Sequence, residues 1–297
     1  MELQPLSLNN KDIINSYLSQ RAHVLCAYAF ENIYVWRCLY DICLSFYKKK
    51  LCLFFTDPSG CFMVLPPLGG WDSDVIEACF DQMEAVNHNP DISRIENLEE
   101  ADLAFFQNKN FRIFEKSKDY LVDRASIASF ASGKYKAKRA LYNYFIKHYS
   151  YCFRDYRASD YKEVVALYDA WAKSRAEKNR DGVYNMLLND GAKVLAQMLA
   201  DMEVLPICAK VLEIEGHIRG FTSGFSVTKS IFCVNFEFVD AAFKGSSQYI
   251  FSAFASQLKE YEFINMMDDC GIKNIRWTKK SFHPSRSMAS YTVLKSG

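Results

Sequence analysis

The spacing of apolar residues along the chain predicts a series of amphipathic helices. In residues 11–21 and 133–149 the apolar side chains recur three or four positions apart, and polar or lysine side chains occupy the other side. The same period returns later in the chain. The predicted helices cover residues 11–21, 72–90, 133–149, 161–178, 184–203 and 247–263. Each of them has an apolar side that must pack against another element.

Shorter apolar runs bounded by turn residues predict strands. Residues 51–67 read as a hairpin around an Asp-Pro-Ser-Gly turn, and residues 206–227 read as a second hairpin around Glu215-Gly216. Residues 230–243 form a third run, with little room for charge on its buried face. The second half is therefore predicted to run helix, helix, strand, strand, strand, helix, strand.

These elements indicate an α/β (α+β) fold with mixed sheets flanked by helices. The chain has 297 residues, half of them hydrophobic, which is enough for one large core or two smaller ones. We find no Pro/Gly/Ser-rich linker, so we expect two tightly packed halves. The predicted domains are residues 1–150 and 151–297.

Charge and cysteine content narrow the function class. The 36 basic and 35 acidic residues leave a net charge of +1, which argues against a protein that binds nucleic acid through overall charge. The ten cysteines include no C-x-x-C pair, and no His stands at ligand spacing, so we expect no metal site. The N-terminus lacks a signal-peptide pattern and no apolar run could span a membrane, which favours a cytoplasmic location.

One local basic patch stands out against the neutral total charge. Lys134, Lys136, Lys138 and Arg139 lie close together, with tyrosines among them. Such a surface could meet the phosphates of tRNA or of lipid, although most charge runs are simply solvated helix faces. The chain has no P-loop, dinucleotide-binding fingerprint, G-x-S-x-G elbow or zinc-hydrolase motif.

The strand at 230–243 leads into a helix through a glycine turn. Gly245 could let backbone N–H groups approach a phosphate, or Ser246 or Ser247 could merely cap the helix. Glu237 lies inside an apolar run, where burial could raise its pKa and make it a general base; a structural glutamate is the alternative. Asp240, three residues on, would point to the opposite face of the strand, so one of the two acids could face a cleft while the other holds the turn.

A second candidate site lies near the C-terminus, in the segment DDCGIKNIRWTKKSFHP. Asp268 and Asp269 could form a solvated turn, or one of them could pair with a nearby cation or bind an ammonium group. Arg276 could hold a phosphate or carboxylate with its planar guanidinium, and Lys279 would supply a point charge.

Three stretches give the chain a family resemblance: KDYLVDRASIASFASGKYKAKRALYNYF, NFEFVDAAFKGSSQYIFSAFASQL and INMMDDCGIKNIRWTKKSFHP. Together they resemble the domain family named after the C-terminal half of phosphatidylglycerol lysyltransferase. The resemblance implies two consecutive acetyltransferase-like (GNAT, acyl-CoA N-acyltransferase-like) domains, of which we expect the first to be non-catalytic. It also implies transfer of an aminoacyl group from aminoacyl-tRNA to a lipid hydroxyl.

The resemblance assigns roles to individual residues. The implied catalytic residues are Glu237, Asp269 and Lys279. The implied substrate-binding residues are Asp240, Gly245, Arg276, Lys138 and Arg139. Polar residues of the family pattern are replaced in this chain by Ala140, Phe238, Met266 and Met267.

Two kinds of function follow from these residues. The first is an aminoacyl- or acyltransferase that moves an activated acyl group, from aminoacyl-tRNA or acyl-CoA, to an amine or hydroxyl of a lipid or peptide acceptor. The alternative is a non-catalytic GNAT-like binding module, suggested by the lost polar residues. An acyl-CoA-dependent N-acyltransferase is favoured less, because Ala242 stands where the usual pyrophosphate loop begins. No cofactor beyond such a donor is implied.

Overall fold

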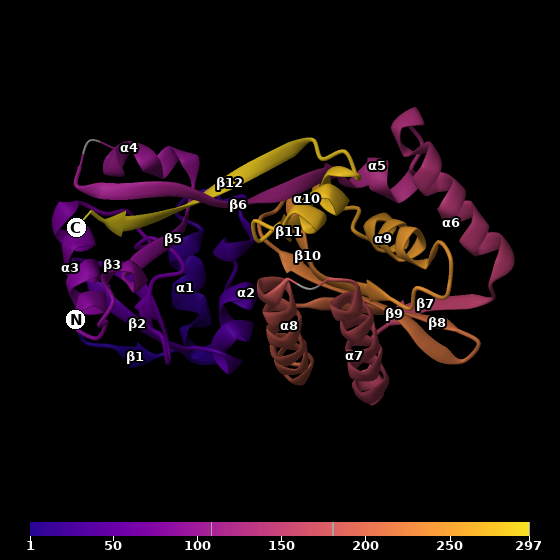
Figure 1. Cartoon of the computed structure of the whole chain (residues 1–297), viewed down its shortest axis with the longest axis horizontal. Coiled ribbons are helices and arrows are strands. Elements are labelled where there is room, and N and C mark those ends of the chain that lie inside the picture. The colour runs from indigo at the N-terminus through magenta and orange to yellow at the C-terminus, as the bar shows by residue number, and fades with distance from the viewer. Residues whose placement is uncertain (108, 180, 297) are drawn as a thin grey trace. The chain divides into compact units, whose positions relative to one another are not determined.

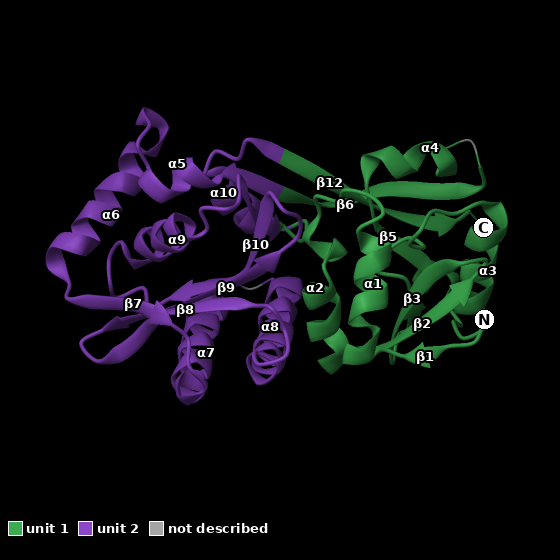
Figure 2. Ribbon diagram, turned by 180° about the vertical axis from the view of Figure 1, so that it is seen from behind, with its two compact units in different colours: residues 1–119, 268–271, 287–297 green, residues 120–267, 272–286 purple. Residues whose placement is uncertain are grey.

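The structure is a computed structural model that describes residues 1–107, 109–179 and 181–296 (Figure 1). The chain divides into two compact units (Figure 2). Unit 1 comprises residues 1–119, 268–271 and 287–297, and unit 2 comprises residues 120–267 and 272–286. The boundary predicted near residue 150 falls inside unit 2. Compact units and GNAT-like halves are different divisions of a chain, so the predicted domain boundary stays a prediction.

A small antiparallel sheet forms part of unit 1. Its strands, in spatial order, are β1 (Gln4–Pro5), β2 (Asp41–Tyr47), β3 (Lys50–Asp57) and β4 (Gly60–Phe62). The hairpin predicted for residues 51–67 is confirmed, because β3 and β4 pair across the turn that begins at Asp57. The Asp57 carboxylate closes that turn by accepting from the amide of Ser59 at 2.7 Å.

The helices of unit 1 are α1 (Lys11–Leu18), α2 (Phe30–Val35), α3 (Ser73–Glu84) and α4 (Leu103–Phe106). Asp72 caps α3, since its Oδ1 accepts from the amide of Val75 at 3.0 Å. The apolar side of α3, which includes Val75, Ile76 and Phe80, is buried.

A second sheet has eight strands. In spatial order they are β5 (Arg94–Leu98), β12 (Arg286–Lys295), β6 (Phe111–Asp123), β11 (Phe263–Asp268), β10 (Ile231–Val239), β9 (His217–Ser226), β8 (Cys208–Ile214) and β7 (Tyr151–Asp155). The long strands β6 and β12 carry residues of both units. In unit 2, β7 to β10 are antiparallel neighbours, while β10 and β11 are parallel.

The parallel pairing of β10 with β11 joins Ile231–Cys233 to residues 263–265. A bulge follows in β10, where the register shifts between Val234 and Phe236. A bulge bends its strand and changes where the following side chains point. Residues 236–239, including Glu237, come after the bulge, so the bulge affects where their side chains point.

The helices of unit 2 are α5 (Arg124–Ser129), α6 (Lys136–His148), α7 (Tyr161–Lys178), α8 (Gly182–Ala200), α9 (Ser246–Gln257) and α10 (Lys273–Lys280). Figure 1 shows α9 on one face of β8 to β10, beside α5 and α6, and α7 with α8 on the other face. The element order predicted for the second half is found from α7 to β11, and the structure adds β7 before it and α10 and β12 after it.

Gly191 stands in the middle of α8, where a glycine ordinarily weakens a helix. A Cβ at this position would lie 2.3 Å from the hydroxyl oxygen of Tyr168 on α7. That hydroxyl donates to the carbonyl of Leu188 at 3.0 Å. The glycine therefore lets α7 and α8 approach each other closely.

Candidate functional site

Gly245 makes the turn from β10 into α9. It has a φ of 89° and occupies the N-cap position, so Ser246 and Ser247 are not the cap that the sequence offered as an alternative. A Cβ here would lie 2.2 Å from the backbone oxygen of Leu141 on α6. Glycine is thus required both for the left-handed backbone conformation and for the close approach of α6.

Asp240 holds the same turn. Its Oδ1 accepts from the amide of Ala242 at 2.9 Å, and its Oδ2 accepts from Nη1 of Arg219 at 3.2 Å. Arg219 is in turn stacked over the ring of Phe243, 5.4 Å from its centroid. Of the two acids Glu237 and Asp240, it is therefore Asp240 that holds the turn.

Glu237 differs from every other predicted acid. The residue as a whole is half-buried, but its Oε2 is fully buried and has no hydrogen-bond partner among the described residues. Burial disfavours the charged form and raises the pKa of Glu237 to about 8. A carboxyl group with this pKa exchanges its proton near neutral pH, which is what a general acid or base requires.

Asp269 belongs to unit 1, whereas the other seven predicted site residues belong to unit 2. Its side chain is fully buried, and its Oδ1 accepts from the amide of Gly271 at 3.0 Å. Its own amide donates to the carbonyl of Lys118 at 3.2 Å. The turn continues through Cys270, whose φ is 49°, and Gly271, whose φ is 71°. The buried carboxylate thus stabilises a turn with left-handed backbone.

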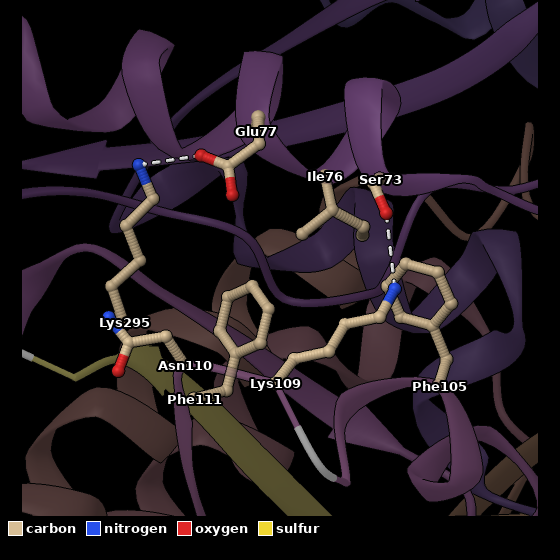
Figure 3. A pocket seen from close by; sticks show the side chains of 8 residues that line it. All are labelled: Ser73, Ile76, Glu77, Phe105, Lys109, Asn110, Phe111 and Lys295. Carbon is tan, nitrogen blue, oxygen red and sulfur yellow. Dashed lines mark hydrogen bonds and ion pairs between the residues drawn. The ribbon is translucent and has the colours of Figure 1, made fainter.

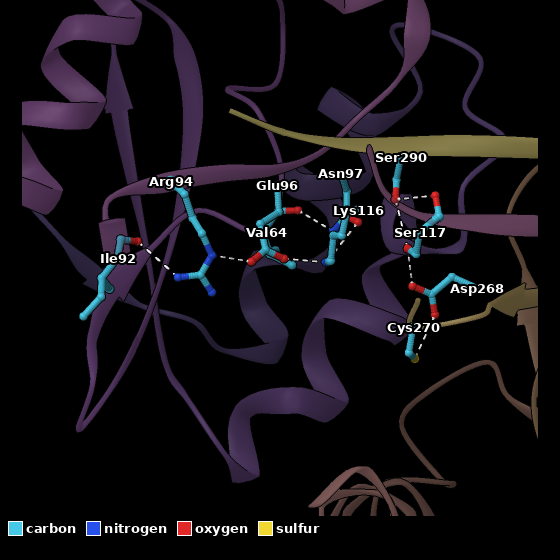
Figure 4. Close-up of polar contacts among 10 residues, drawn as sticks. All are labelled: Val64, Ile92, Arg94, Glu96, Asn97, Lys116, Ser117, Asp268, Cys270 and Ser290. Carbon is cyan, nitrogen blue, oxygen red and sulfur yellow. Dashed lines mark hydrogen bonds and ion pairs between the residues drawn. The ribbon is translucent and has the colours of Figure 1, made fainter. Parts of the chain in front are cut away.

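Asp268 lies in a hydrogen-bonded network that the sequence does not reveal (Figure 4). Its Oδ2 accepts from the Ser117 hydroxyl at 2.5 Å, and the hydroxyls of Ser117 and Ser290 lie 3.1 Å apart. Nearby, Lys116 pairs with Glu96. Burial alone would lower the pKa of Lys116, but the carboxylates of Glu96 and Asp268 raise it above its ordinary value. The residues come from separate strands, so only the fold brings them together.

The predicted cations of unit 2 all have contacts within the protein. The Lys279 ammonium donates to the carbonyl of Met266, and one Arg139 nitrogen donates to the carbonyls of residues 130–132, which follow α5. Arg276 is half-buried on α10. A ligand at Lys279 or Arg139 would have to replace these contacts.

Lys138 reaches from α6 to the segment after α10. Its Nζ donates to the Ser281 hydroxyl at 2.9 Å and lies 3.5 Å from the centroid of the Phe282 ring. Burial lowers the pKa of Lys138 to about 8. The structure thus brings together Lys138 and the end of the helix that carries Arg276 and Lys279.

Two of the four positions where family polar residues are replaced, Phe238 and Met266, pack against the core, whereas Ala140 is exposed and Met267 is half-buried. Phe238 is buried and contacts the rings of Tyr168 and Phe221 at centroid distances of 5.1 Å and 5.4 Å. Met266 packs against the buried cluster around Phe251. These side chains have a packing role that charged residues could not fill.

Unit 1 contains a separate pocket of about 280 Å³ (Figure 3). Ser73, Ile76 and Glu77 of α3 form one wall. Lys109 reaches the Ser73 hydroxyl at 3.1 Å, and Lys295 reaches Glu77 at 3.1 Å. None of the predicted site residues lines this pocket.

Across residues 1–107, 109–179 and 181–296, no group of three or more His, Cys, Asp or Glu side chains could hold a metal ion. No helix in that same part of the chain is long and apolar enough to cross a membrane. All ten cysteines are free thiols.

Comparison with solved structures shows which fold this is. A conserved protein of unknown function from Bacteroides thetaiotaomicron superposes with a TM-score of 0.85 at 22% identity, covering 99% of both chains. The C-terminal domain of a putative lysylphosphatidylglycerol synthetase from Agrobacterium fabrum gives 0.65 at 15% identity, covering 98% of this chain and 93% of that chain. A tandem GNAT protein from the clavulanic acid biosynthesis pathway gives 0.54 at 8% identity, covering 100% and 98%. The predicted tandem GNAT fold is confirmed.

A search of curated proteins found no match. The family model described as "Phosphatidylglycerol lysyltransferase, C-terminal" matches residues 20–294. Since the match spans nearly the whole chain, the protein belongs to the family of the C-terminal domain of phosphatidylglycerol lysyltransferase.

Proposed function

We propose that this protein is an aminoacyltransferase that moves an aminoacyl group from aminoacyl-tRNA to an amine or hydroxyl of an acceptor. Membership of the family supports the reaction class, and the tandem GNAT fold is compatible with it. The observation that carries the proposal is the buried carboxyl of Glu237, which has no partner among the described residues and a pKa of about 8.

In the proposed reaction, the ionised carboxylate of Glu237 accepts the proton of the acceptor amine or hydroxyl. The freed lone pair attacks the carbonyl carbon of the aminoacyl ester, and the negative charge passes to the carbonyl oxygen. The ester C–O bond then breaks, the tRNA ribose oxygen leaves, and the proton from Glu237 neutralises it. Only the ionised fraction of Glu237 can begin this cycle, so the rate should rise as pH approaches 8.

The cations of α10 and α6 would bind the aminoacyl-tRNA donor. Arg276 and Lys279 would hold its phosphate or stabilise the developing oxyanion, and Lys138 and Arg139 would extend the contact toward tRNA. Lys273, Trp277 and Lys280 follow one another along one side of α10, and the Trp277 side chain is 74% exposed. An exposed tryptophan between two ammonium groups suits a nucleic acid, because it can stack on an unpaired base while the lysines meet phosphates.

The test is transfer from tRNA charged with a labelled amino acid to lipid or peptide acceptors, with uncharged tRNA as a binding control. Glu237→Gln should reduce the single-turnover rate about 100-fold or more, in the range usual for loss of a general base. Glu203→Gln is the matched control, since Glu203 is an exposed residue of the same unit. Equal rates for wild type and Glu237→Gln would contradict the proposal. The acceptor that receives label identifies the acceptor class.

A second candidate function is the non-catalytic binding module. The observation in its favour is that Lys279 and Arg139, two of the cations proposed to hold the donor, already donate to backbone carbonyls. Under this hypothesis the charged tRNA, or an acyl-CoA, binds without being discharged. Isothermal titration with acetyl-CoA tests whether the protein binds an acyl-CoA. Binding would favour the acyl-CoA alternative, because an aminoacyl-tRNA enzyme has no need to bind acetyl-CoA.

A further inference from the structure

Four polar side chains form one row across the strands β7 to β10. Glu237 lies directly opposite Thr222, Thr222 opposite Lys210, and Lys210 opposite Asp155 in the antiparallel register. Residues that oppose each other on neighbouring strands project from the same face of a sheet. The row therefore runs along one face, from Glu237 in β10 to the edge strand β7.

The face is the one that carries α9. A Cβ added at Gly220 would lie 3.1 Å from both Ile250 of α9 and Val239 of β10. Thr222 follows Gly220 by two residues along β9, so the two share a face. Glu237 precedes Val239 by two residues on β10 and shares that face too. The row thus lies beneath α9.

Apolar side chains occupy the rows on both sides. Leu212 and Val239 belong to one apolar cluster, and Val234 and Cys208 to another. Thr222 is completely buried between them. Burying a hydroxyl and a carboxyl beside each other costs free energy unless they acquire partners, so packing alone does not explain this choice of residues.

The two ends of the row differ in their partners. The Thr222 Oγ1 and the Glu237 Oε2 are both buried, and neither has a hydrogen-bond partner in the part of the chain that the structure describes. At the other end, the Lys210 ammonium lies 2.7 Å from Asp155. The Asp155 side chain is 79% exposed, while that of Lys210 is only 14% exposed. An ion pair with so exposed a partner is weak, and Lys210 can leave it for a buried carboxylate.

Lys210 is the cation of this row. The helix α9 above it carries no Asp, Glu, Lys or Arg, and its one ionisable side chain is Tyr249. The strand β8 adds Cys208 to the same face; burial raises the pKa of this thiol, the Lys210 ammonium opposes the rise, and the carboxylates of Asp155 and Glu260 add to it. Lys210 and Asp155 are therefore the charged residues of the row to which Glu237 belongs.

We propose that Thr222 and Lys210 are positioning residues that stabilise the ionised carboxylate of Glu237. In that state the Thr222 hydroxyl donates to Glu237 Oε2 and accepts from the Lys210 ammonium, which turns away from Asp155. The inference rests on the proposed function for its catalytic meaning, because a general base at Glu237 must carry this negative charge between proton transfers. We call this chain of contacts from Lys210 through Thr222 to Glu237 the relay. It is a property of the fold, so its effect on the pKa of Glu237 can be measured without turnover.

The proposal predicts shifts of opposite sign. Thr222→Val and Lys210→Met each remove support for the carboxylate, so each should raise the pKa of Glu237 by about one unit. Asp155→Asn frees Lys210 from its competing partner, so it should lower that pKa by a few tenths of a unit. Thr222→Ser keeps the hydroxyl and Lys210→Arg keeps the charge, and both should stay near wild type.

The experiment is an NMR titration of protein labelled with ¹³C at the glutamate carboxyl, in which Glu237→Gln identifies the Glu237 signal. Lys229→Met, at an exposed lysine of the turn between β9 and β10, is the control for removing one positive charge. A raised pKa in Thr222→Val and Lys210→Met, together with a lowered pKa in Asp155→Asn, supports the proposal. If the pKa of Glu237 equals the wild-type value in Asp155→Asn, and also in Thr222→Val or in Lys210→Met, the proposal is overturned.

The same variants separate this inference from the proposed function. If the pKa shifts occur but wild-type protein transfers no aminoacyl group, the relay stands and the transferase proposal fails. If transfer occurs and depends on Glu237, but the pKa does not respond to Thr222, Lys210 or Asp155, the relay is wrong and the transferase proposal stands.

Discussion

The acids of the turn at residues 268–271 in unit 1 and Glu237 in unit 2 have opposite surroundings. Asp269 is fully buried and accepts from the amide of Gly271, and Asp268 accepts from the hydroxyl of Ser117. Glu237 has a buried oxygen with no partner in the described residues, and its pKa is raised to about 8. Both Asp269 and Glu237 have buried carboxyl atoms, so the two residues differ in the hydrogen bonds that their carboxyl groups receive.

The comparison shows how to separate structural acids from reactive ones. A carboxylate that receives hydrogen bonds is stabilised in its charged form and holds the backbone that donates to it. A carboxyl without donors keeps its proton to higher pH and can exchange it under physiological conditions. By this criterion Glu237 is the stronger candidate base, while the catalytic role expected of Asp269 stays a prediction.

The largest effect on stability is expected at Asp269. Asp269→Ala removes a buried acceptor and leaves the Gly271 amide without it, so the free energy of unfolding should fall by about 2–3 kcal/mol. Urea denaturation at pH 7 measures this loss, with Asp91→Ala, an exposed acid of the same unit, as the control. An unchanged midpoint would show that the turn does not depend on the carboxylate.

Glu237→Gln should change stability in a way that depends on pH. Because the folded-state pKa of Glu237 lies above the ordinary value of 4.5, the stability that the protonated Glu237 contributes is complete only below about pH 4.5 and is lost as pH rises toward 8. Glutamine does not titrate. The variant should therefore gain about 2 kcal/mol relative to wild type between pH 5 and pH 8, with partial exposure keeping the gain below the full linkage value. Parallel curves of melting temperature against pH would contradict the raised pKa.

Ser117→Ala removes the hydroxyl that donates to Asp268. We expect the free energy of unfolding to fall by about 1–1.5 kcal/mol, as for other hydrogen bonds to charged groups. Ser117→Thr keeps a hydroxyl and serves as the comparison in the same denaturation experiment. A loss equal in the two variants would mean that packing around residue 117, and not the hydrogen bond, is responsible.

The smallest effect is expected at Thr222. At pH 6, where Glu237 is protonated, Thr222→Val replaces by a methyl group a buried hydroxyl that has no partner among the described residues, so it should be neutral or stabilising by up to about 0.5 kcal/mol. At pH 9 the same variant should become destabilising, because the ionised carboxylate then lacks its donor. Destabilisation by 1 kcal/mol or more at pH 6 would show that the hydroxyl has a partner when Glu237 is neutral.

Much of the fold could be predicted from local patterns. The hairpin at Asp57 and the helix capped by Asp72 follow from turn and capping residues that act over a few positions. The order of elements in the second half follows from apolar periodicity. Local patterns do not reveal that β6 and β12 contribute to both compact units, because strand pairing joins residues far apart in the chain.

The candidate site was only partly predictable. The apolar run around Glu237 indicated a buried carboxyl, but nothing local shows that Thr222 and Lys210 continue its row, since register joins three different strands. The same holds for Ser117, 151 positions before Asp268 along the chain. From the sequence we expect Lys279 and Arg139 to contact a ligand. The sequence does not show that backbone carbonyls already accept hydrogen bonds from both side chains.

The most direct test of the account is the titration of Glu237 itself in wild-type protein, followed through its carboxyl ¹³C signal from pH 4 to pH 10. The account predicts a single transition with a pKa of about 8, absent in Glu237→Gln. A transition near 4.5 would mean that Glu237 is ionised at neutral pH, that burial does not raise its pKa, and that the contrast drawn with Asp269 fails.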